Sequence, residues 1–201
     1  MSQHYYSQHP EVTSKQRSFT AEVKGRSFSF VADHGVFSKE GLDFGSRFLL
    51  ETFTEPDFSG PLLDMGCGYG PIGIILSAFT GRRAVMADVN ERAVALARQN
   101  VLLNDANRVE VVSGDRFAGV GKEERFSAIV TNPPIRAGKA TVHAIFSEAY
   151  DYLMPGGALW VVIRKKQGAP TAKRKLQEVY EEVVEVKKEK GYFVYKAKVK
   201  V

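Results

Sequence analysis

The sequence has almost none of the residues that cross-link a chain or bind structural metals. Cys67 is the only cysteine among 201 residues, which excludes an intrachain disulfide and is typical of a reducing compartment. The four histidines form no cluster with the spacing of metal ligands, so we expect no metal. What remains is the ordinary composition of a globular domain, with 44% hydrophobic and 25% charged residues.

Long apolar runs are also missing. No stretch reaches the length needed to cross a bilayer, and the polar first residues lack the apolar core of a signal peptide. We therefore expect a cytoplasmic protein with no membrane partner. Since no repeat and no Pro/Gly/Ser-rich linker divides the chain, we expect a flexible lead-in over 1–17 and a single domain over 18–201. Within it, 18–57 would hold a hairpin and a helix, and 58–201 a Rossmann-like core.

Apolar periodicity predicts a β-hairpin over 18–31 and a helix over 43–53. From residue 61 onward, strand and helix patterns alternate, which is typical of a parallel sheet covered by helices on both faces. The predicted strands are 61–65, 84–89, 109–113, 128–131 and 158–163, and the predicted helices between them are 71–79, 91–103 and 142–153.

The end of the chain follows a different pattern. After a helix near 172–180, two strand-like runs, 183–188 and 192–199, are joined through Gly191 with no room for a crossover helix. We therefore expect them to form an antiparallel hairpin. A parallel sheet closed by an antiparallel last strand differs from the six-strand dinucleotide-binding order.

A glycine-rich loop connects the first core strand to the helix that follows. Gly66, Gly68 and Gly70 allow a tight turn and a close approach of a ligand to the backbone, at the positively polarised start of a helix. The spacing from Gly68 to Gly73 also satisfies the dinucleotide fingerprint, with Asp88 following 20 residues after Gly68. On this motif alone, an NAD-dependent dehydrogenase remains open.

Acidic residues lie at the ends of three successive strands. A carboxylate at Asp64 would hold the cationic methionine end of S-adenosylmethionine (SAM) and would repel a pyrophosphate. Asp88 is placed to accept from ribose hydroxyls, and Asp115 to accept from an adenine amino group, with Phe117 beside the ring. Because ligands bind at the carboxyl ends of parallel strands, the three acids together predict a cofactor site.

The motif Asn132-Pro133-Pro134-Ile135 follows the fourth core strand. Two prolines fix the backbone and remove N–H donors that would compete for its carbonyls. The side-chain oxygen of Asn132 and the carbonyl of Pro133 are then expected to accept the two N–H groups of an exocyclic amine. This would hold the amine nitrogen in line with the methyl group. The motif predicts methyl transfer to the amine of guanine or adenine.

Taken in order, these motifs resemble those of class I SAM-dependent amino-methyltransferases. The segments 35–38, 43–46 and 132–139 further resemble the small-subunit ribosomal RNA guanine-N2 methyltransferase family (RsmC type), and the resemblance spans 18–201. It implies an α/β, Rossmann-like class I methyltransferase fold with a seven-stranded, mostly parallel sheet and an antiparallel last strand. It also implies SAM as cofactor, ribosomal RNA or the small ribosomal subunit as partner, and N2-methylguanosine as product.

The resemblance further implies that Phe37 and the segment 43–46 cover the methionine end of the cofactor. Arg136 and Lys139 lie beside the amine site, where contact with phosphates and ordinary solvent exposure are equally compatible with the sequence. The candidate catalytic residues are Asn132, Pro133, Pro134 and Ile135, and the candidate substrate-binding residues are Arg136 and Lys139. The candidate cofactor-binding residues are Phe37, Asp64, Gly66, Gly68, Gly70, Asp88, Val89, Asp115, Arg116 and Asn132.

Two features depart from the family pattern. Well-known members carry a second, degenerate methyltransferase-like domain that helps to bind RNA, whereas this chain has one such domain. Ile135 stands where an aromatic residue is usual, so stacking on the target base must come from elsewhere or be replaced by apolar contact. A homodimer, or reliance on a basic surface (net charge +5, with clusters at 164–166, 173–175 and 187–188), would replace the second domain.

Three alternatives stay open from the sequence alone. The first is methylation of another amine, either adenine N6 in nucleic acid or a protein glutamine amide. The second is an NAD-dependent oxidoreductase that uses the loop from Gly68 to Gly73, against which the Asn-Pro-Pro motif and the final hairpin speak. The third is a non-catalytic RNA-binding protein, which the presence of Asn132 and all three acids disfavours.

Overall fold

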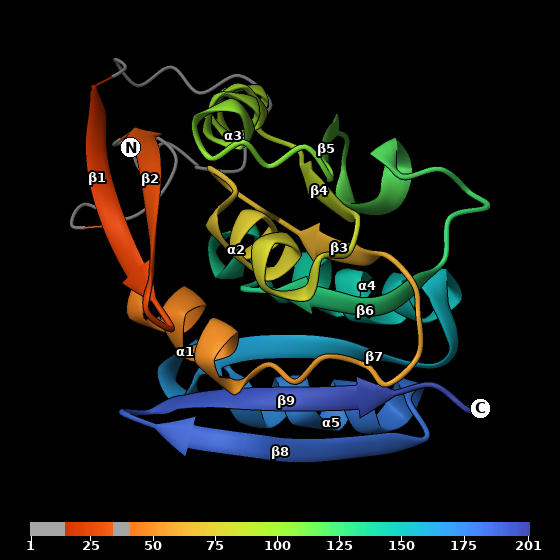
Figure 1. The fold of residues 1–201 in the computed structure, drawn as a ribbon. Helices are drawn as coiled ribbons and strands as arrows, with labels where there is room; N and C mark the ends of the chain where they lie inside the picture. Colours follow the sequence, from red (N-terminus) through yellow and green to blue (C-terminus); the bar gives the residue numbers. More distant parts are fainter. Residues whose placement is uncertain (1–14, 34–40) are drawn as a thin grey trace.

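A seven-stranded β-sheet runs through the centre of the computed structural model, which describes residues 15–33 and 41–201 (Figure 1). The strand order is β5-β4-β3-β6-β7-β9-β8. Strands β3 to β7 are parallel, β9 is antiparallel to β7, and β8 is antiparallel to β9. The predicted fold class is therefore confirmed. The strands are β3 Leu62–Met65, β4 Ala84–Asp88, β5 Val109–Ser113, β6 Phe126–Thr131, β7 Leu153–Arg164, β8 Glu182–Glu189 and β9 Tyr192–Lys198.

Helices cover both faces of the sheet (Figure 1), and each face has its own hydrophobic core. Strand alternation divides β7 between them: Trp160 and Val162 point to the first core, and Leu159 and Val161 to the second. No helix in the described part of the chain is long and apolar enough to span a membrane. Helices α1 Phe44–Thr52, α2 Pro71–Thr80 and α3 Glu91–Leu103 lie on the first face, and α4 Lys139–Glu148 and α5 Ala169–Val179 on the second.

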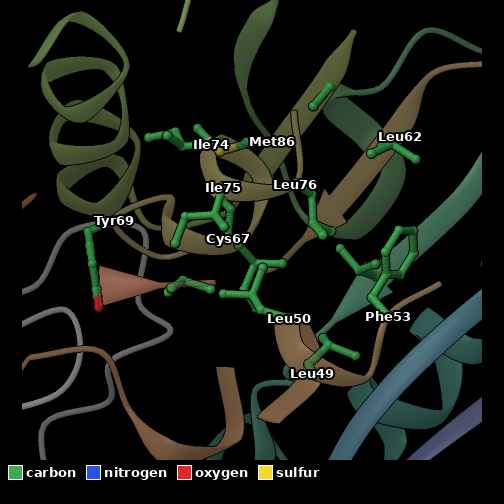
Figure 2. Close-up of a cluster of buried hydrophobic side chains, with 14 of the residues drawn as sticks. Leu49, Leu50, Phe53, Leu62, Cys67, Tyr69, Ile74, Ile75, Leu76 and Met86 are labelled. Carbon is green, nitrogen blue, oxygen red and sulfur yellow. The ribbon is translucent and has the colours of Figure 1, made fainter. Parts of the chain in front are cut away.

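The first core lies directly beneath the glycine loop. Figure 2 shows leucines and isoleucines of α1 and α2 packed together beside Met86 of β4 and Cys67 of the loop itself, with Tyr69 at the border of the cluster. Both loop side chains are almost fully buried, at 6% and 1% exposure. Since burying a large apolar side chain stabilises the fold by about 1.5–3 kcal/mol, this cluster fixes the loop on the sheet.

Both ends of one predicted helix are wrong. The predicted helix over 142–153 begins earlier, at Lys139, and its α-helical part ends at Glu148, followed by the 3-10 turn η3 Ala149–Tyr152. Leu153 belongs instead to β7, where it pairs with Phe126 of β6. Tertiary pairing with β6 therefore overrides the helical pattern at this end.

The predicted N-terminal hairpin is present as a separate two-stranded sheet, β1 Gln16–Val23 and β2 Arg26–Asp33. It begins two residues before the predicted domain start at residue 18. Residues 1–14 of the predicted lead-in lie outside the described residues.

Two asparagines one turn apart on α3 hold this hairpin by bonding to the free edge of β2. The Asn100 amide accepts from Val31 N (2.7 Å) and donates to Val31 O (2.9 Å). The Asn104 amide makes the same pair of bonds with Ser29 N (3.1 Å) and Ser29 O (2.7 Å). Asn100 Nδ2 also donates to Tyr69 O (2.8 Å) in the glycine loop. The hairpin, α3 and the loop are thus joined through one buried side chain.

Replacing Asn100 by alanine should destabilise the protein, because the Val31 N–H, the Val31 carbonyl and the Tyr69 carbonyl would lose this partner. We expect the free energy of unfolding to fall by roughly 2–5 kcal/mol in urea denaturation. The exposed Asn107 supplies a matched control, since Asn107→Ala should change it by less than about 0.5 kcal/mol. Equal effects of the two variants would contradict the role assigned to Asn100.

Candidate active site

The glycine loop adopts a backbone conformation that suits glycine alone. Gly66, Gly68 and Gly70 have φ values of 74°, 57° and 93°, where a side chain would be strained. A Cβ on Gly68 would meet nothing within 4 Å, whereas one on Gly66 would lie 3.7 Å from Pro134 Cδ. The loop therefore has open space at Gly68 for a ligand and lies against the Asn-Pro-Pro motif at Gly66.

Gly73 serves a different purpose from the three loop glycines. A Cβ at this position would lie 2.5 Å from Met86 Cγ, so glycine is needed for α2 to pack closely on β4. The residue that completes the dinucleotide-like spacing is thus explained by helix packing.

Asp88, at the end of β4, fixes the glycine loop by accepting a hydrogen bond from its backbone. Its Oδ2 accepts from Gly68 N (2.9 Å) and its Oδ1 from Asn90 N (2.9 Å). Burial raises the pKa of this carboxyl, and the backbone N–H donors oppose that shift. Each carboxylate oxygen keeps a further lone pair for a ligand hydroxyl. Val89 follows it, half-buried, at the same end of β4.

Asp64, at the end of β3, is 1% exposed and only half satisfied. Its Oδ2 accepts from Gly73 N (2.9 Å), while its Oδ1 is buried without a hydrogen-bond partner among the described residues. Burial raises the pKa of Asp64 to about 7; the Gly73 N–H opposes that rise and the charge of Asp88 adds to it. Desolvation of this kind is reversed when a cation binds beside the carboxylate.

Two further buried polar atoms at this end of the sheet lack partners in the part of the chain that the structure describes: the Tyr69 hydroxyl and Asp43 Oδ2. Burial raises the pKa of Tyr69, and the negative charge of Asp43 adds to the shift. Two carboxylate oxygens, Asp43 Oδ2 and Asp64 Oδ1, and the Tyr69 hydroxyl thus lack partners beside the open glycine loop. A ligand that is cationic and donates hydrogen bonds would satisfy them. The ammonium and sulfonium of SAM have this chemistry, so these residues fit the predicted cofactor.

The Asn132 side chain is held by the segment at the start of α1. Its Nδ2 donates to Asp43 Oδ1 (3.3 Å) and Ser46 Oγ (3.2 Å). A carboxylate only accepts, so the nitrogen rather than the oxygen of the amide faces Asp43. The amide oxygen has no hydrogen-bond partner among the described residues. It is therefore available as an acceptor.

Gly45 makes this contact possible, because a Cβ there would lie 3.1 Å from Asp43 Oδ1 and 3.4 Å from Asn132 Nδ2. From the family resemblance we expected the segment 43–46 to cover the cofactor. Its bond to Asn132 was missed, although the Asp43 helix cap is visible in the sequence: Ser46 N donates to Asp43 Oδ1 (3.1 Å).

The Asn-Pro-Pro backbone corrects one expectation. Pro133 O does not lack a competing donor, because Ile135 N donates to it (2.8 Å). Pro134, with φ −73° and ψ 78°, is the centre of this inverse γ-turn. The prolines thus tighten the turn, and one lone pair of the Pro133 carbonyl remains. Ile135 is half-buried and packs against the core beneath α4.

The third predicted acid, Asp115, is exposed and lies 3.5 Å from the Arg116 guanidinium, which also contacts Glu148 Oε1 (2.9 Å). Arg116 has a φ of 49°, a strained value for a residue with a side chain. Phe117, expected beside the adenine, is instead 4% exposed and stacks on Tyr152. Phe37 lies outside the described residues.

The remaining candidates behave as follows. Arg136 and Lys139 are exposed and lie just after the Asn-Pro-Pro motif, in the 3-10 turn η2 Ile135–Ala137 and at the first residue of α4.

Burial and the charges of Asp88 and Asp64 raise the pKa of the Cys67 thiol, which disfavours a thiolate nucleophile. Within 15–33 and 41–201, no group of three His, Cys, Asp or Glu side chains is placed to hold a metal.

A parallel sheet closed by one antiparallel strand, a glycine loop braced by two acids, and an Asn-Pro-Pro turn at the adjacent strand end together define a class I, SAM-dependent methyltransferase. The family model "Methyltransferase small domain" matches residues 27–196. The chain belongs to this family. The dehydrogenase alternative is thereby excluded.

Several relatives are similar over most of the chain. The uncharacterized protein YbxB of Bacillus subtilis is 49% identical over 98% of this chain and 99% of its own length. Ribosomal RNA small subunit methyltransferase C of Vibrio cholerae is 30% identical over 73% of this chain. Ribosomal RNA large subunit methyltransferase G of Klebsiella pneumoniae is 32% identical over 76% of this chain. The chain matches only 43% and 42% of these two enzymes.

Among solved structures, the 16S rRNA N2 methyltransferase RsmC of T. thermophilus, in complex with AdoMet and guanosine, has a TM-score of 0.81 and 27% identity. The match covers 95% of this chain and 52% of that one. A methyltransferase from Pyrococcus furiosus, with a TM-score of 0.67 and 22% identity, shares the fold.

Asp64 should make the cofactor-free protein less stable as the pH rises. Its folded-state pKa of about 7 exceeds the ordinary 3.8, so the folded state holds a proton that the unfolded chain releases. The stability from this proton is complete below pH 3.8 and is lost as the pH rises through 7. Between pH 5 and 8 we expect the wild type to lose about 2–3 kcal/mol more than Asp64→Asn in urea unfolding.

The same variant should bind SAM at least ten-fold more weakly at pH 8 by calorimetry, because an amide carries no charge for the ammonium (about 1.4 kcal/mol). The exposed Asp105→Asn is the matched control. Parallel pH profiles for wild type and Asp64→Asn would show that Asp64 does not titrate in this range.

Proposed function

We propose that this protein transfers the methyl group of SAM to an exocyclic amine of a base in ribosomal RNA, with guanine N2 as the acceptor. The observation that carries the proposal is the fixed amide of Asn132, whose nitrogen is tied to Asp43 and Ser46 and whose oxygen remains an acceptor. Similarity to methyltransferases whose names specify ribosomal RNA supports the substrate class. The RsmC structure with guanosine supports the choice of base.

Two adjoining loops would bind the two ligands: the glycine loop and the strand ends beside it would bind SAM, and the Asn-Pro-Pro turn would bind the acceptor amine. Asp64 would hold the ammonium of the methionine end, Asp88 the ribose hydroxyls, and Asp115 the adenine amino group. When bound, SAM supplies a methyl group made electrophilic by the neighbouring sulfonium. Gly66, which adjoins Pro134, would bring the two ligands together.

The acceptor amine needs orientation because its lone pair is delocalised into the ring. The Asn132 oxygen and the remaining lone pair of the Pro133 carbonyl would accept its two N–H bonds and favour the pyramidal geometry of the transition state. No strong base is required, since the proton can leave after transfer. Asp43 and Ser46 then act as positioning residues, because they hold Asn132 and do not touch the amine.

The proposal extends to partners and location. Arg136 and Lys139 are exposed beside the amine site, where phosphates of ribosomal RNA or of the small subunit would lie. The chain spans less than half of the two ribosomal RNA methyltransferases compared above. A second copy of the chain or its own basic surface would therefore supply further RNA contacts. A cytoplasmic location follows from such a substrate.

Replacing Asn132 by alanine should reduce methyl transfer by about 100-fold or more, because one oriented acceptor is worth about 3 kcal/mol in the transition state. The measurement is transfer of labelled methyl from SAM to undermethylated small subunits and to deproteinised ribosomal RNA, followed by nucleoside analysis. Wild-type product should be N2-methylguanosine. Asn107→Ala, at an exposed asparagine, should behave as wild type.

Other outcomes identify other acceptors. Label in N6-methyladenosine, or in a protein glutamine amide after assay with release factors, would replace the guanine assignment and keep the role of Asn132. If SAM binds and no RNA of either form is methylated, the ribosomal RNA proposal is refuted.

A further inference from the structure

One wall beside the amine site is formed by the ends of β7 and β9. Thr131, the last residue of β6, pairs with Val161, and β7 continues for three more residues to Arg164. Arg164 pairs with Tyr192, the first residue of β9. Strand alternation places both side chains on the α1 side of the sheet, where Asn132 meets Asp43.

Gly45 links this wall to the catalytic asparagine. A Cβ on Gly45 would lie 3.2 Å from Tyr192 Cε1 and 3.4 Å from Asn132 Nδ2. The Tyr192 ring is therefore separated from the Asn132 amide only by the backbone at the start of α1. The ring is half-buried, and its centroid lies 5.1 Å from that of Phe44.

The outer side of the wall is cationic. The Arg164 guanidinium lies 5.5 Å from the Tyr192 ring centroid and is exposed. In the described part of the chain it has no carboxylate partner. Lys165 and Lys166 follow it and are also exposed. Lys190 Nζ lies 5.1 Å from the centroid of the Phe44 ring and 3.8 Å from Glu189 Oε1, with 71% of its side chain exposed.

A planar cation supported by an aromatic ring is suited to a nucleobase. Unpaired RNA bases stack on arginine planes as well as on aromatic rings, and lysines nearby neutralise the backbone between them. The carboxylates of an acidic peptide would be attracted by the charges, but they offer no aromatic face to stack on the guanidinium. Ile135 packs against the other core and offers no aromatic ring to an RNA base on this side of the sheet.

Resting on the proposed function, we propose that Arg164 binds the RNA substrate directly. Its guanidinium, supported by Tyr192, stacks on an unpaired base next to the target base, and Lys165, Lys166 and Lys190 contact the flanking phosphates. Arg164 is then a substrate-binding residue, and Tyr192 is a positioning residue that keeps the guanidinium flat against the wall.

Arg164→Lys separates stacking from charge, because lysine keeps the cation and loses the plane. We would measure binding of a short fluorescein-labelled single-stranded RNA by anisotropy over a range of salt concentrations, without SAM. Arg164→Lys should weaken binding by about 5- to 50-fold with an unchanged salt slope. Tyr192→Leu should do the same, whereas Lys166→Ala should lower the salt slope by about one.

The control is Arg125→Lys, at an exposed arginine beside the opposite end of β6, which should bind as wild type. All variants should retain wild-type SAM affinity. If Arg164→Lys binds RNA as tightly as wild type, and only Arg164→Ala is weaker, Arg164 acts through charge alone and the stacking proposal is wrong.

Catalysis keeps this proposal distinct from the proposed function. In the methyl-transfer assay, Arg164→Lys should raise KM for RNA by a similar factor and leave kcat nearly unchanged. If the wild type methylates RNA and Arg164→Lys has no effect, the proposal that Arg164 binds RNA is wrong and the proposed methyl transfer is supported. If Arg164→Lys loses RNA binding but the wild type transfers no methyl group to RNA, the proposal that Arg164 binds RNA is supported and the proposed methyl transfer is wrong.

Discussion

Two hydrogen bonds from backbone to carboxylate determine the shape of the active site: Gly68 N to Asp88 and Gly73 N to Asp64. Asp88 ends β4 and Asp64 is the last residue but one of β3, so the loop, the start of α2 and the sheet edge are fixed as one unit. Each acid thus braces the loop and is also presented to a ligand. Burial raises the pKa of both carboxyls, so it makes their ionisation less favourable in the free protein, and it strengthens any interaction with a cation that binds there. Stability and ligand affinity are therefore opposed at Asp64.

The other half of the site comes from the N-terminal part of the chain. Asn132 lies 89 residues after Asp43, which holds its amide. Helix α1 is fixed on the sheet by Leu49 and Leu50, both almost fully buried in the cluster of Figure 2. The hairpin before it is joined through Asn100 to the glycine loop. Packing of the hairpin and of α1 on the core thus determines how the Asn132 amide is held.

The local motifs predicted most of the fold, because strand alternation, glycine spacing and the Asn-Pro-Pro turn depend on neighbouring residues. The roles of the candidate site residues stay a prediction. The bonds between distant side chains were not predictable in this way. Asn100 on α3 reads as an ordinary polar helix residue, and its role appears only once β2 lies beside it. The end of α4 was misplaced because pairing of Leu153 with Phe126 depends on tertiary structure. Phe117 was expected at a ligand and is used in the core.

Ile135 and the Asn132 amide, although only three residues apart, lie toward opposite faces of the sheet. The inverse γ-turn at Pro134 brings Ile135 against the core beneath α4, on the second face of the sheet. The Asn132 amide turns to the first face, toward α1. Among the described residues, Phe44 of α1 and Tyr192 of β9 place aromatic rings near that amide, with their centroids 5.1 Å apart. Because β9 is antiparallel, it begins at the edge where the parallel strands end, and this places the Tyr192 ring of the last hairpin near Asn132.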